Sequence, residues 1–285
     1  VRDSPLVTLI PVDPLRRARL AVGIVFLVNG AVFGSWAPHI PLVQERLGLG
    51  PAVLGAALLA AAVGALLAML GAGALIARYG SAPVTRVSGL MLCVSLPVVA
   101  LAPDLAFLVA ALALFGASNG IMDVAMNAHG VAVETRLQQP IMSSLHGMFS
   151  LGGLLGAGTG ALLLGWLSPP THILFAAAVL VVVAWLVMRH LLPGRVDVGD
   201  AGPHFVLPTR AALGFGALAF LVLMTEGAIL DWSAAWLRGD LGASPSMAAT
   251  AFAAFSATMA AGRFGGDHLR RRFGAEILVR GSACV

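Results

Sequence analysis

Charged residues are scarce in this chain. Asp, Glu, Lys and Arg together make up 11% of its 285 residues, and all of the basic residues among them are arginines. A typical soluble domain has about 25% charged and about 45–50% apolar residues. Here the apolar share is 59%, and the mean hydropathy is +0.94. So few polar side chains could not cover a surface in water, which argues against a soluble globular protein.

Cysteine is scarce as well, and common enzyme motifs are missing. Cys93 and Cys284 offer no disulfide framework and no metal site. The sequence contains neither the His-Glu-x-x-His of zinc proteases nor a Walker loop. A Gly-x-Ser-x-Gly match at 116–120 lies inside a long apolar run, whereas a nucleophile elbow needs a sharp strand-to-helix turn. We therefore expect no enzymatic activity, no cofactor and no metal.

Long apolar runs are what the sequence has instead. A hydrocarbon core about 30 Å thick is crossed by about 20 helical residues. Eight runs approach or exceed that length, at 18–36, 53–77, 84–101, 105–128, 144–167, 173–188, 211–230 and 246–264. A ninth begins at 275 and continues to Val285, and the first residue is Val1, so we expect a C-terminally truncated fragment. The pattern predicts an all-α polytopic membrane protein.

The arginines predict the orientation of these spans. With the N-terminus in the cytoplasm, only Arg46 and Arg238 fall clearly outside, as the positive-inside rule requires. The net charge of +4 therefore reflects topology, and we expect no nucleic-acid partner. Residues 1–13 lack the apolar core of a cleaved signal peptide. We expect a multi-pass inner (plasma) membrane protein with a cytoplasmic N-terminus.

A stretch rich in proline, glycine and aspartate divides the chain. It predicts a cytoplasmic linker at 192–210, between an N-terminal six-helix bundle at 18–191 and a partial C-terminal bundle at 211–285. A cytoplasmic segment is expected at 1–17. Leu-Gly-Leu-Gly-Pro at 47–51 recurs as Leu-Gly-Ala-Ser-Pro at 241–245, and Arg-Tyr-Gly at 78–80 recurs as Arg-Phe-Gly at 272–274. The shared offset of about 194 residues predicts a parallel internal repeat.

With six spans, a linker and a second set that repeats the first, the chain resembles the major facilitator superfamily. That family carries Gly-x-x-x-Asp-Arg-x-Gly after the second span of each half. Residues 73–80 match it except at Ala77, and in the second half the acid falls earlier. Residues 119–127 and 143–147 resemble the fucose-permease-like branch and its uncharacterised bacterial inner-membrane relatives. By this resemblance, the cytoplasmic gating loops contain Arg78, Gly80, Arg263, Asp267, Arg272 and Gly274.

The resemblance implies a fold of two six-helix bundles, the second incomplete here. It also implies a secondary-active transporter that moves a small organic solute by alternating access, with protons as the coupling ion and a sugar as the preferred substrate. The expected partners are that solute, protons and the lipid bilayer, and the expected state is a monomer. Two alternatives remain: an exporter of hydrophobic compounds, and a non-transporting membrane scaffold or pseudo-transporter.

Polar residues inside the spans are candidates for a substrate or proton cavity. Asn119, Asp123 and Asn127 are four residues apart and share one helical face. A charged side chain in a span costs about 2.5–3.5 kcal/mol and normally faces the bundle interior. Interhelical hydrogen bonding is the alternative role for the asparagines. Glu226 corresponds to Asn29 in the repeat, and the superfamily lines its cavity with the first and fourth spans of each half. The predicted cavity contains Asn29, Asn119, Asp123, Asn127 and Glu226.

Four further residues lie closer to the ends of the spans. For Trp36, Asp231 and Trp232, at outer ends, we expect an outer cavity or the membrane interface. His146 begins the fifth span near the cytoplasm, where it is expected to relay protons or to form a packing hydrogen bond.

Glycine is abundant, and some of the glycines are regularly spaced. Gly152, Gly156 and Gly160 recur at four-residue intervals along the fifth apolar run. Small residues at this spacing let helix backbones approach closely in a membrane. The stripe therefore predicts a tight helix–helix contact.

Overall fold

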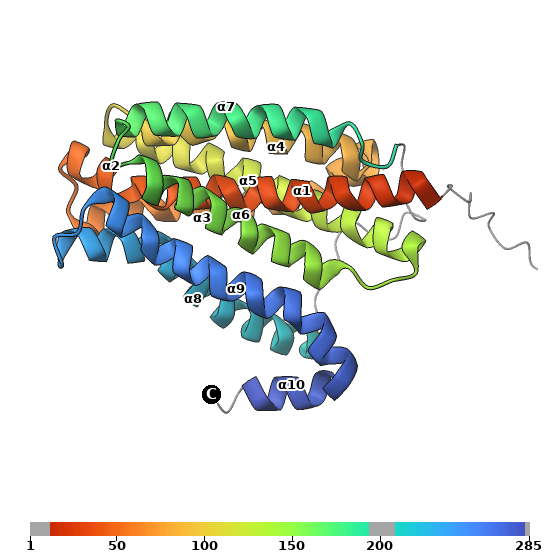
Figure 1. Ribbon diagram of the computed structural model, residues 1–285. Coiled ribbons are helices and arrows are strands. Elements are labelled where there is room, and N and C mark those ends of the chain that lie inside the picture. Colours follow the sequence, from red (N-terminus) through yellow and green to blue (C-terminus); the bar gives the residue numbers. More distant parts are fainter. Residues whose placement is uncertain (1–11, 194–208, 283–285) are drawn as a thin grey trace, which may run out of the picture.

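The computed structural model describes residues 12–193 and 209–282, and every element in these ranges is a helix (Figure 1). The first half contains α1 (Val12–Trp36), α2 (His39–Leu47), α3 (Pro51–Tyr79), α4 (Ser81–Ala100), α5 (Leu105–Leu137), α6 (Met142–Leu163) and α7 (Pro169–Met188). The second contains α8 (Arg210–Gly239), α9 (Pro245–Phe273) and α10 (Ala275–Ser282). The predicted all-α class is confirmed. Most of the predicted N-terminal segment and linker, at 1–11 and 194–208, lies outside the described residues.

Each of the eight predicted apolar runs forms a helix. Six helical stretches of the described chain are long and apolar enough to cross a membrane, namely Pro14–Leu47, Pro51–Tyr79, Ser81–Ala100, Leu105–Leu137, Pro169–Met188 and Ala212–Gly239. The other two runs form α6 and α9, of 22 and 29 residues, which are not among these six stretches. At 1.5 Å per residue, α6 is still about 33 Å long. Because α6 packs between α1 and α9, its small residues do not all have to face lipid.

The sequence did not predict α2, because this helix mixes polar and apolar residues and forms no long apolar run. Polar contacts hold this helix across one end of the bundle. The rings of His39 and His172 are stacked, with Nε2 of the first 2.9 Å from Nδ1 of the second. Arg46 donates to the carbonyls of Ala100 and Ala102, at 2.9 and 2.6 Å. These two carbonyls lie at the C-terminal end of α4, where helices leave acceptors unsatisfied, so α2 also caps α4.

Glycine allows α6 to lie directly on the backbone of α1. A Cβ added at Gly152 would overlap the carbonyl group of Leu27, and one added at Gly156 would overlap that of Ala31. In return, Gly30 of α1 meets the carbonyl group of Phe149. The predicted tight contact of the glycine stripe is therefore confirmed. A second seam of the same kind joins α3 and α5, where glycines again meet backbone carbonyls.

The predicted internal repeat recurs in the backbone. α3 and α9 are both 29 residues long, and both begin with proline. The turn before each contains a left-handed glycine, Gly48 and Gly242, each with φ 62°. The turn after each contains another, Gly80 with φ 86° and Gly274 with φ 79°. Glycine adopts positive φ without the steric cost that other residues incur, which explains why these positions match in both halves.

Candidate functional site

Two of the polar groups inside the apolar bundle contain residues predicted for the site. The first, here called the amide cluster, consists of Asn29 on α1 and Asn119 and Met122 on α5. Nδ2 of Asn29 donates to Oδ1 of Asn119 at 3.0 Å and lies 3.3 Å from Sδ of Met122. Asn29 is only 2% exposed. A buried amide needs hydrogen-bond partners, so this contact fixes α1 against α5.

The other two polar residues predicted on α5 continue along the helix. Nδ2 of Asn127 donates to the backbone carbonyl of Asp123 at 2.9 Å and to its Oδ1 at 3.2 Å. Asn119, Asp123 and Asn127 are all half-buried, whereas the neighbouring Met122 and Met126 are fully buried. The polar face of α5 therefore lies beside its core face. A role of Asp123 in binding solute or protons stays a prediction.

The second group, the arginine cluster, joins three helices from both halves of the chain. Arg263 of α9 lies at its centre. Its Nη2 is 3.2 and 3.3 Å from the two carboxylate oxygens of Glu226 on α8. Its Nη1 donates to Oγ of Ser150 on α6 at 2.9 Å and lies 3.4 Å from the carbonyl oxygen of His146. The Glu226 and Arg263 side chains are each 24% exposed, so the ion pair is largely shielded from solvent.

The arginine cluster corrects one prediction and leaves another open. Arg263 was expected in a cytoplasmic gating loop, but α9 continues to Phe273, so this arginine lies inside a helix. Glu226 was expected to correspond to Asn29 in the repeat and to share a cavity with it; its carboxylate pairs with Arg263, and its place in that cavity stays a prediction. An arginine within the apolar run 246–264 was the sequence signal for this site. Nothing in the sequence pointed to Ser150.

His146 connects the two clusters. Its carbonyl accepts from Arg263, and its ring packs edge-on against Phe26, with centroids 5.3 Å apart. Phe26 is fully buried one turn before Asn29 on α1. His146 thus contacts Arg263 through its backbone and α1 through its ring. Proton relay through His146 stays a prediction.

The remaining residues predicted for the gating loops lie at helix ends. Arg78, in the last turn of α3, lies over the ring of Tyr79 at 5.2 Å, and Arg272 lies over Phe273 at 5.3 Å. Gly80 and Gly274 form the turns that follow. Asp267 is within α9, and its side chain lies outside the described part of the structure. The gating role of these residues is a prediction that remains open.

The three residues expected at an outer cavity or the membrane interface differ in exposure. Trp36 is 3% exposed and belongs to the core, so it does not lie at the interface, and its place at an outer cavity stays a prediction. Asp231 is half-buried on α8. Trp232 is 38% exposed, and its ring lies close to Gly55 of α3, where an added Cβ would be 3.4 Å from Cζ2. This tryptophan therefore contacts the other half of the chain.

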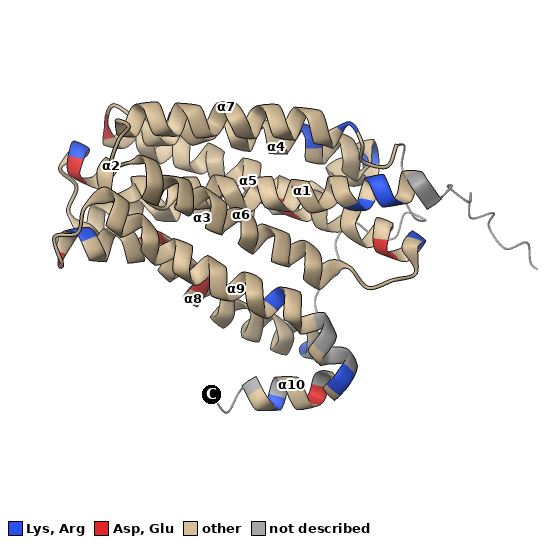
Figure 2. Ribbon diagram, viewed as in Figure 1, with Lys and Arg blue, Asp and Glu red and all other residues tan. Residues whose placement is uncertain are grey.

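At the α2 end of the bundle, a bidentate ion pair joins the two halves. Nε of Arg238 on α8 is 2.6 Å from Oε1 of Glu45 on α2, and its Nη2 is 2.7 Å from Oε2. Figure 2 shows charged residues at this end and a larger group of arginines at the opposite end, where α1 begins. The halves are therefore linked by charge both at the α2 end and at the arginine cluster.

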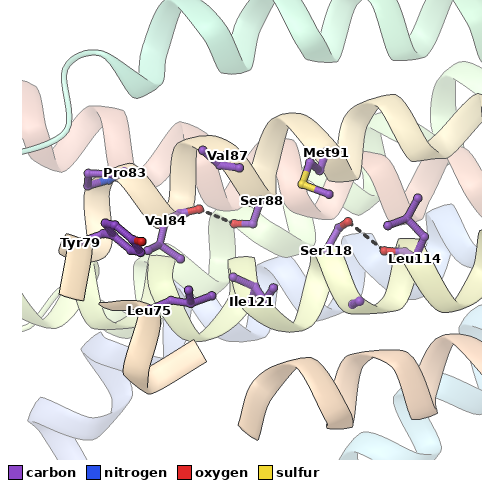
Figure 3. A pocket seen from close by; sticks show the side chains of 11 residues that line it. Leu75, Tyr79, Pro83, Val84, Val87, Ser88, Met91, Leu114, Ser118 and Ile121 are labelled. Atoms are coloured by element: carbon purple, nitrogen blue, oxygen red, sulfur yellow. Dashed lines mark hydrogen bonds between the residues drawn. The ribbon is translucent and has the colours of Figure 1, made fainter. Parts of the chain in front are cut away.

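An apolar pocket of about 380 Å³ lies on the flank of the first half, between α3, α4 and α5 (Figure 3). Its two serines are turned to their own helices: Ser88 donates to the carbonyl of Val84 at 2.7 Å and Ser118 to that of Leu114 at 2.8 Å. Val87 is 61% exposed, so the pocket is open to the bundle surface. Apart from Tyr79 the rest of its wall is apolar, so the pocket suits an apolar molecule.

Comparisons with known proteins agree with this architecture. Residues 22–285 match the Major Facilitator Superfamily. The chain is 37% identical over 275 residues to an uncharacterized MFS-type transporter of Yersinia pestis, covering 96% of this chain and 71% of that protein. It is 34% identical to the uncharacterized transporter y4wD of Sinorhizobium fredii, covering 90% and 68%, and 33% identical to membrane protein MosC of Rhizobium meliloti, covering 91% and 63%.

A solved structure shows the same fold. The crystal structure of the nucleoside transporter NupG aligns with a TM-score of 0.62 at 12% identity, covering 90% of this chain and 68% of that one. Placement in the fucose-permease-like branch stays a prediction. Three findings agree: the family match over most of the chain, the transporter relatives and the membrane-length helices. This chain belongs to the major facilitator superfamily of membrane transporters.

Proposed function

We propose that the protein is a secondary-active transporter that moves a small organic solute across the bacterial inner membrane by alternating access, coupled to protons. The arginine cluster carries this proposal. Charged residues at membrane depth are costly and commonly mark substrate or proton pathways. Here one ion pair and its neighbours connect α6 of the first half with α8 and α9 of the second. Transporters of this kind bind between their repeats, where one half moves against the other.

The Glu226–Arg263 pair is the element through which we propose proton coupling. An ionised Glu226 attracts the guanidinium, whereas a protonated one loses the charge that holds it. A proton on Glu226 would therefore loosen α8 from the Arg263 side chain and release donors for a solute. Asp123 is the second acid proposed to face the pathway. The arginines gathered where α1 begins support a cytoplasmic N-terminus, and the proposed working unit is a monomer.

The proposal is tested in proteoliposomes that enclose a pH-sensitive dye. L-fucose, D-galactose, D-glucose and D-xylose are added outside in turn, and proton entry is recorded. We expect at least one sugar to drive proton entry. If none does, the combination of a sugar substrate with proton coupling is wrong.

The variant Asp123→Asn is expected to insert normally but to abolish sugar-driven proton entry, because the amide cannot exchange a proton. Dye fluorescence with the best sugar measures the effect. Asp104→Asn is the matched control, since that acid caps the start of the same helix by accepting from the backbone of Phe107. Wild-type proton entry in Asp123→Asn would remove Asp123 from the mechanism.

The ion pair at the α2 end gives a second prediction. Arg238→Glu removes this ion pair between the two halves. It should lower the free energy of unfolding by about 1 kcal/mol or less, as expected for a partly exposed pair. The double variant Glu45→Arg/Arg238→Glu restores opposite charges and should recover the wild-type unfolding midpoint. Thermal unfolding in detergent measures both. Equal midpoints for the single and double variants would show that the pair does not couple the halves.

Export of hydrophobic compounds is the second candidate, and the apolar pocket in Figure 3 is the observation that favours it. In the same proteoliposomes, a pH gradient would then drive extrusion of a lipophilic dye while no sugar moves protons. A sugar that raises the melting temperature of the purified protein would argue against a non-transporting scaffold, because only a ligand that binds the folded state does so.

A further inference from the structure

A cleft of about 600 Å³ lies at the end of the bundle where α1 begins. Three arginines line it: Arg16 and Arg19 from α1, and Arg136 from the end of α5. Its other lining residues are three leucines and a glutamine, so no acidic side chain takes part in its wall. The cleft is therefore strongly basic, and it is separate from both polar clusters described above.

The helices fix these arginines in a common direction. Arg16 and Arg19 are one turn apart and share a face of α1. Both are exposed, and neither forms a hydrogen bond or an ion pair with another of the residues that the structure describes. Arg136 is half-buried on the other wall, and its Nη1 donates to the carbonyl of Ala132 at 3.0 Å.

One acid near this wall in the sequence, Glu134, is engaged elsewhere. Oε2 of Glu134 accepts from the backbone N–H groups of Ile141 and Met142, at 2.7 and 3.0 Å. This contact closes the turn between α5 and α6. The carboxylate thereby stabilises the loop and does not line the cleft, whose positive charge it leaves in place.

We propose that this cleft binds the phosphate of an anionic phospholipid. A guanidinium donates paired, charge-assisted hydrogen bonds that fit phosphate oxygens. Leu20, next to Arg19 and toward the middle of α1, also lines the cleft and is 68% exposed. An apolar side chain at that position offers a surface for an acyl chain, which a soluble anion does not need. Basic pockets at the ends of spanning helices bind such headgroups by the same combination.

The test uses the full chain, purified in detergent and titrated with phosphatidylglycerol or phosphatidylcholine, with bound lipid measured by native mass spectrometry. We expect selective binding of phosphatidylglycerol. The double variant Arg16→Gln/Arg19→Gln should bind it about 30-fold more weakly, as expected for two arginines lost near an anionic surface. The matched control, Arg189→Gln/Arg210→Gln, removes the same charge from exposed positions outside the cleft and should bind like the wild type.

Three results would overturn the proposal. The first is equal weakening in the control, which would indicate general charge attraction alone. The second is full competition by glycerophosphoglycerol or inorganic phosphate, which would indicate a site for soluble anions. The third is equal binding of phosphatidylcholine. Arg16→Lys/Arg19→Lys keeps the charge and should bind better than the glutamine variant, which separates loss of the site from loss of folding; circular dichroism checks helix content in each variant.

Discussion

Sugar-driven proton entry is expected to fall to the level of empty liposomes when Arg263 is replaced by methionine. The substitution keeps much of the length of the side chain but removes its donors to Glu226 and Ser150. Glu226 is then left with its charge largely shielded from water. Removing one partner of a buried ion pair lowers the free energy of unfolding by about 3–5 kcal/mol, whereas for an exposed pair the loss is about 0–1 kcal/mol. At 24% exposure we expect a loss of about 2 kcal/mol in the free energy of unfolding.

The double variant Arg263→Met/Glu226→Gln separates stability from mechanism. It removes the uncompensated carboxylate, so its unfolding midpoint should recover most of the loss, while proton entry stays absent. Flux in proteoliposomes and thermal unfolding in detergent give the two readouts. Wild-type flux in Arg263→Met would show that the arginine cluster only supports the fold, and the proposed coupling through Glu226 would then be wrong.

A larger loss of stability is expected for Gly152→Leu. The added side chain would overlap the backbone of α1 at Leu27 and Ala31, and neither helix can retreat without opening the seam. Overpacking typically costs about 1–3 kcal/mol, and a clash with backbone belongs at the upper end or above it, so we expect about 3 kcal/mol. The folded fraction is measured by size-exclusion chromatography of the solubilised protein.

Gly158→Leu provides the matched control for this substitution. Gly158 lies on the same helix, and an added Cβ there meets no atom within 4 Å. This variant should elute as a single folded peak at near wild-type yield. Equal loss in both variants would mean that the cost arises from leucine in α6 itself, and the close backbone contact would then not explain the requirement for glycine.

The helices were predictable because the physics that forms them is local. In a membrane, backbone groups have no water to bind, so a long apolar run becomes a helix. The same argument did not predict where α9 ends. This helix continues past the apolar run to Phe273, because arginine is a good helix former even though it is not apolar. It also missed α2, whose order comes from contacts of His39 and Arg46 with distant residues.

Partners across helices were less predictable, because they depend on how each helix is rotated. The spacing on α5 placed Asn119 on a face that could meet Asn29, and these two residues do bond. Glu226 and Arg263 are 37 residues apart on two helices, and their pairing depends on the relative rotation of α8 and α9. A charged residue within an apolar run indicates that a partner exists but does not identify it.

The position of α6 has a consequence for how the molecule can move. On one side, its glycines meet backbone atoms of α1, which have no rotamers to change, so α1 and α6 must travel as one rigid piece. On the other side, Gly147 and Gly153 face α9, and an added Cβ would there meet side-chain atoms of Phe264 and Ser256. Side chains can swing aside where backbone cannot. α6 is thus fixed to the first half, and α9 can shift against it once the contacts of Arg263 with Ser150 and the His146 carbonyl are released.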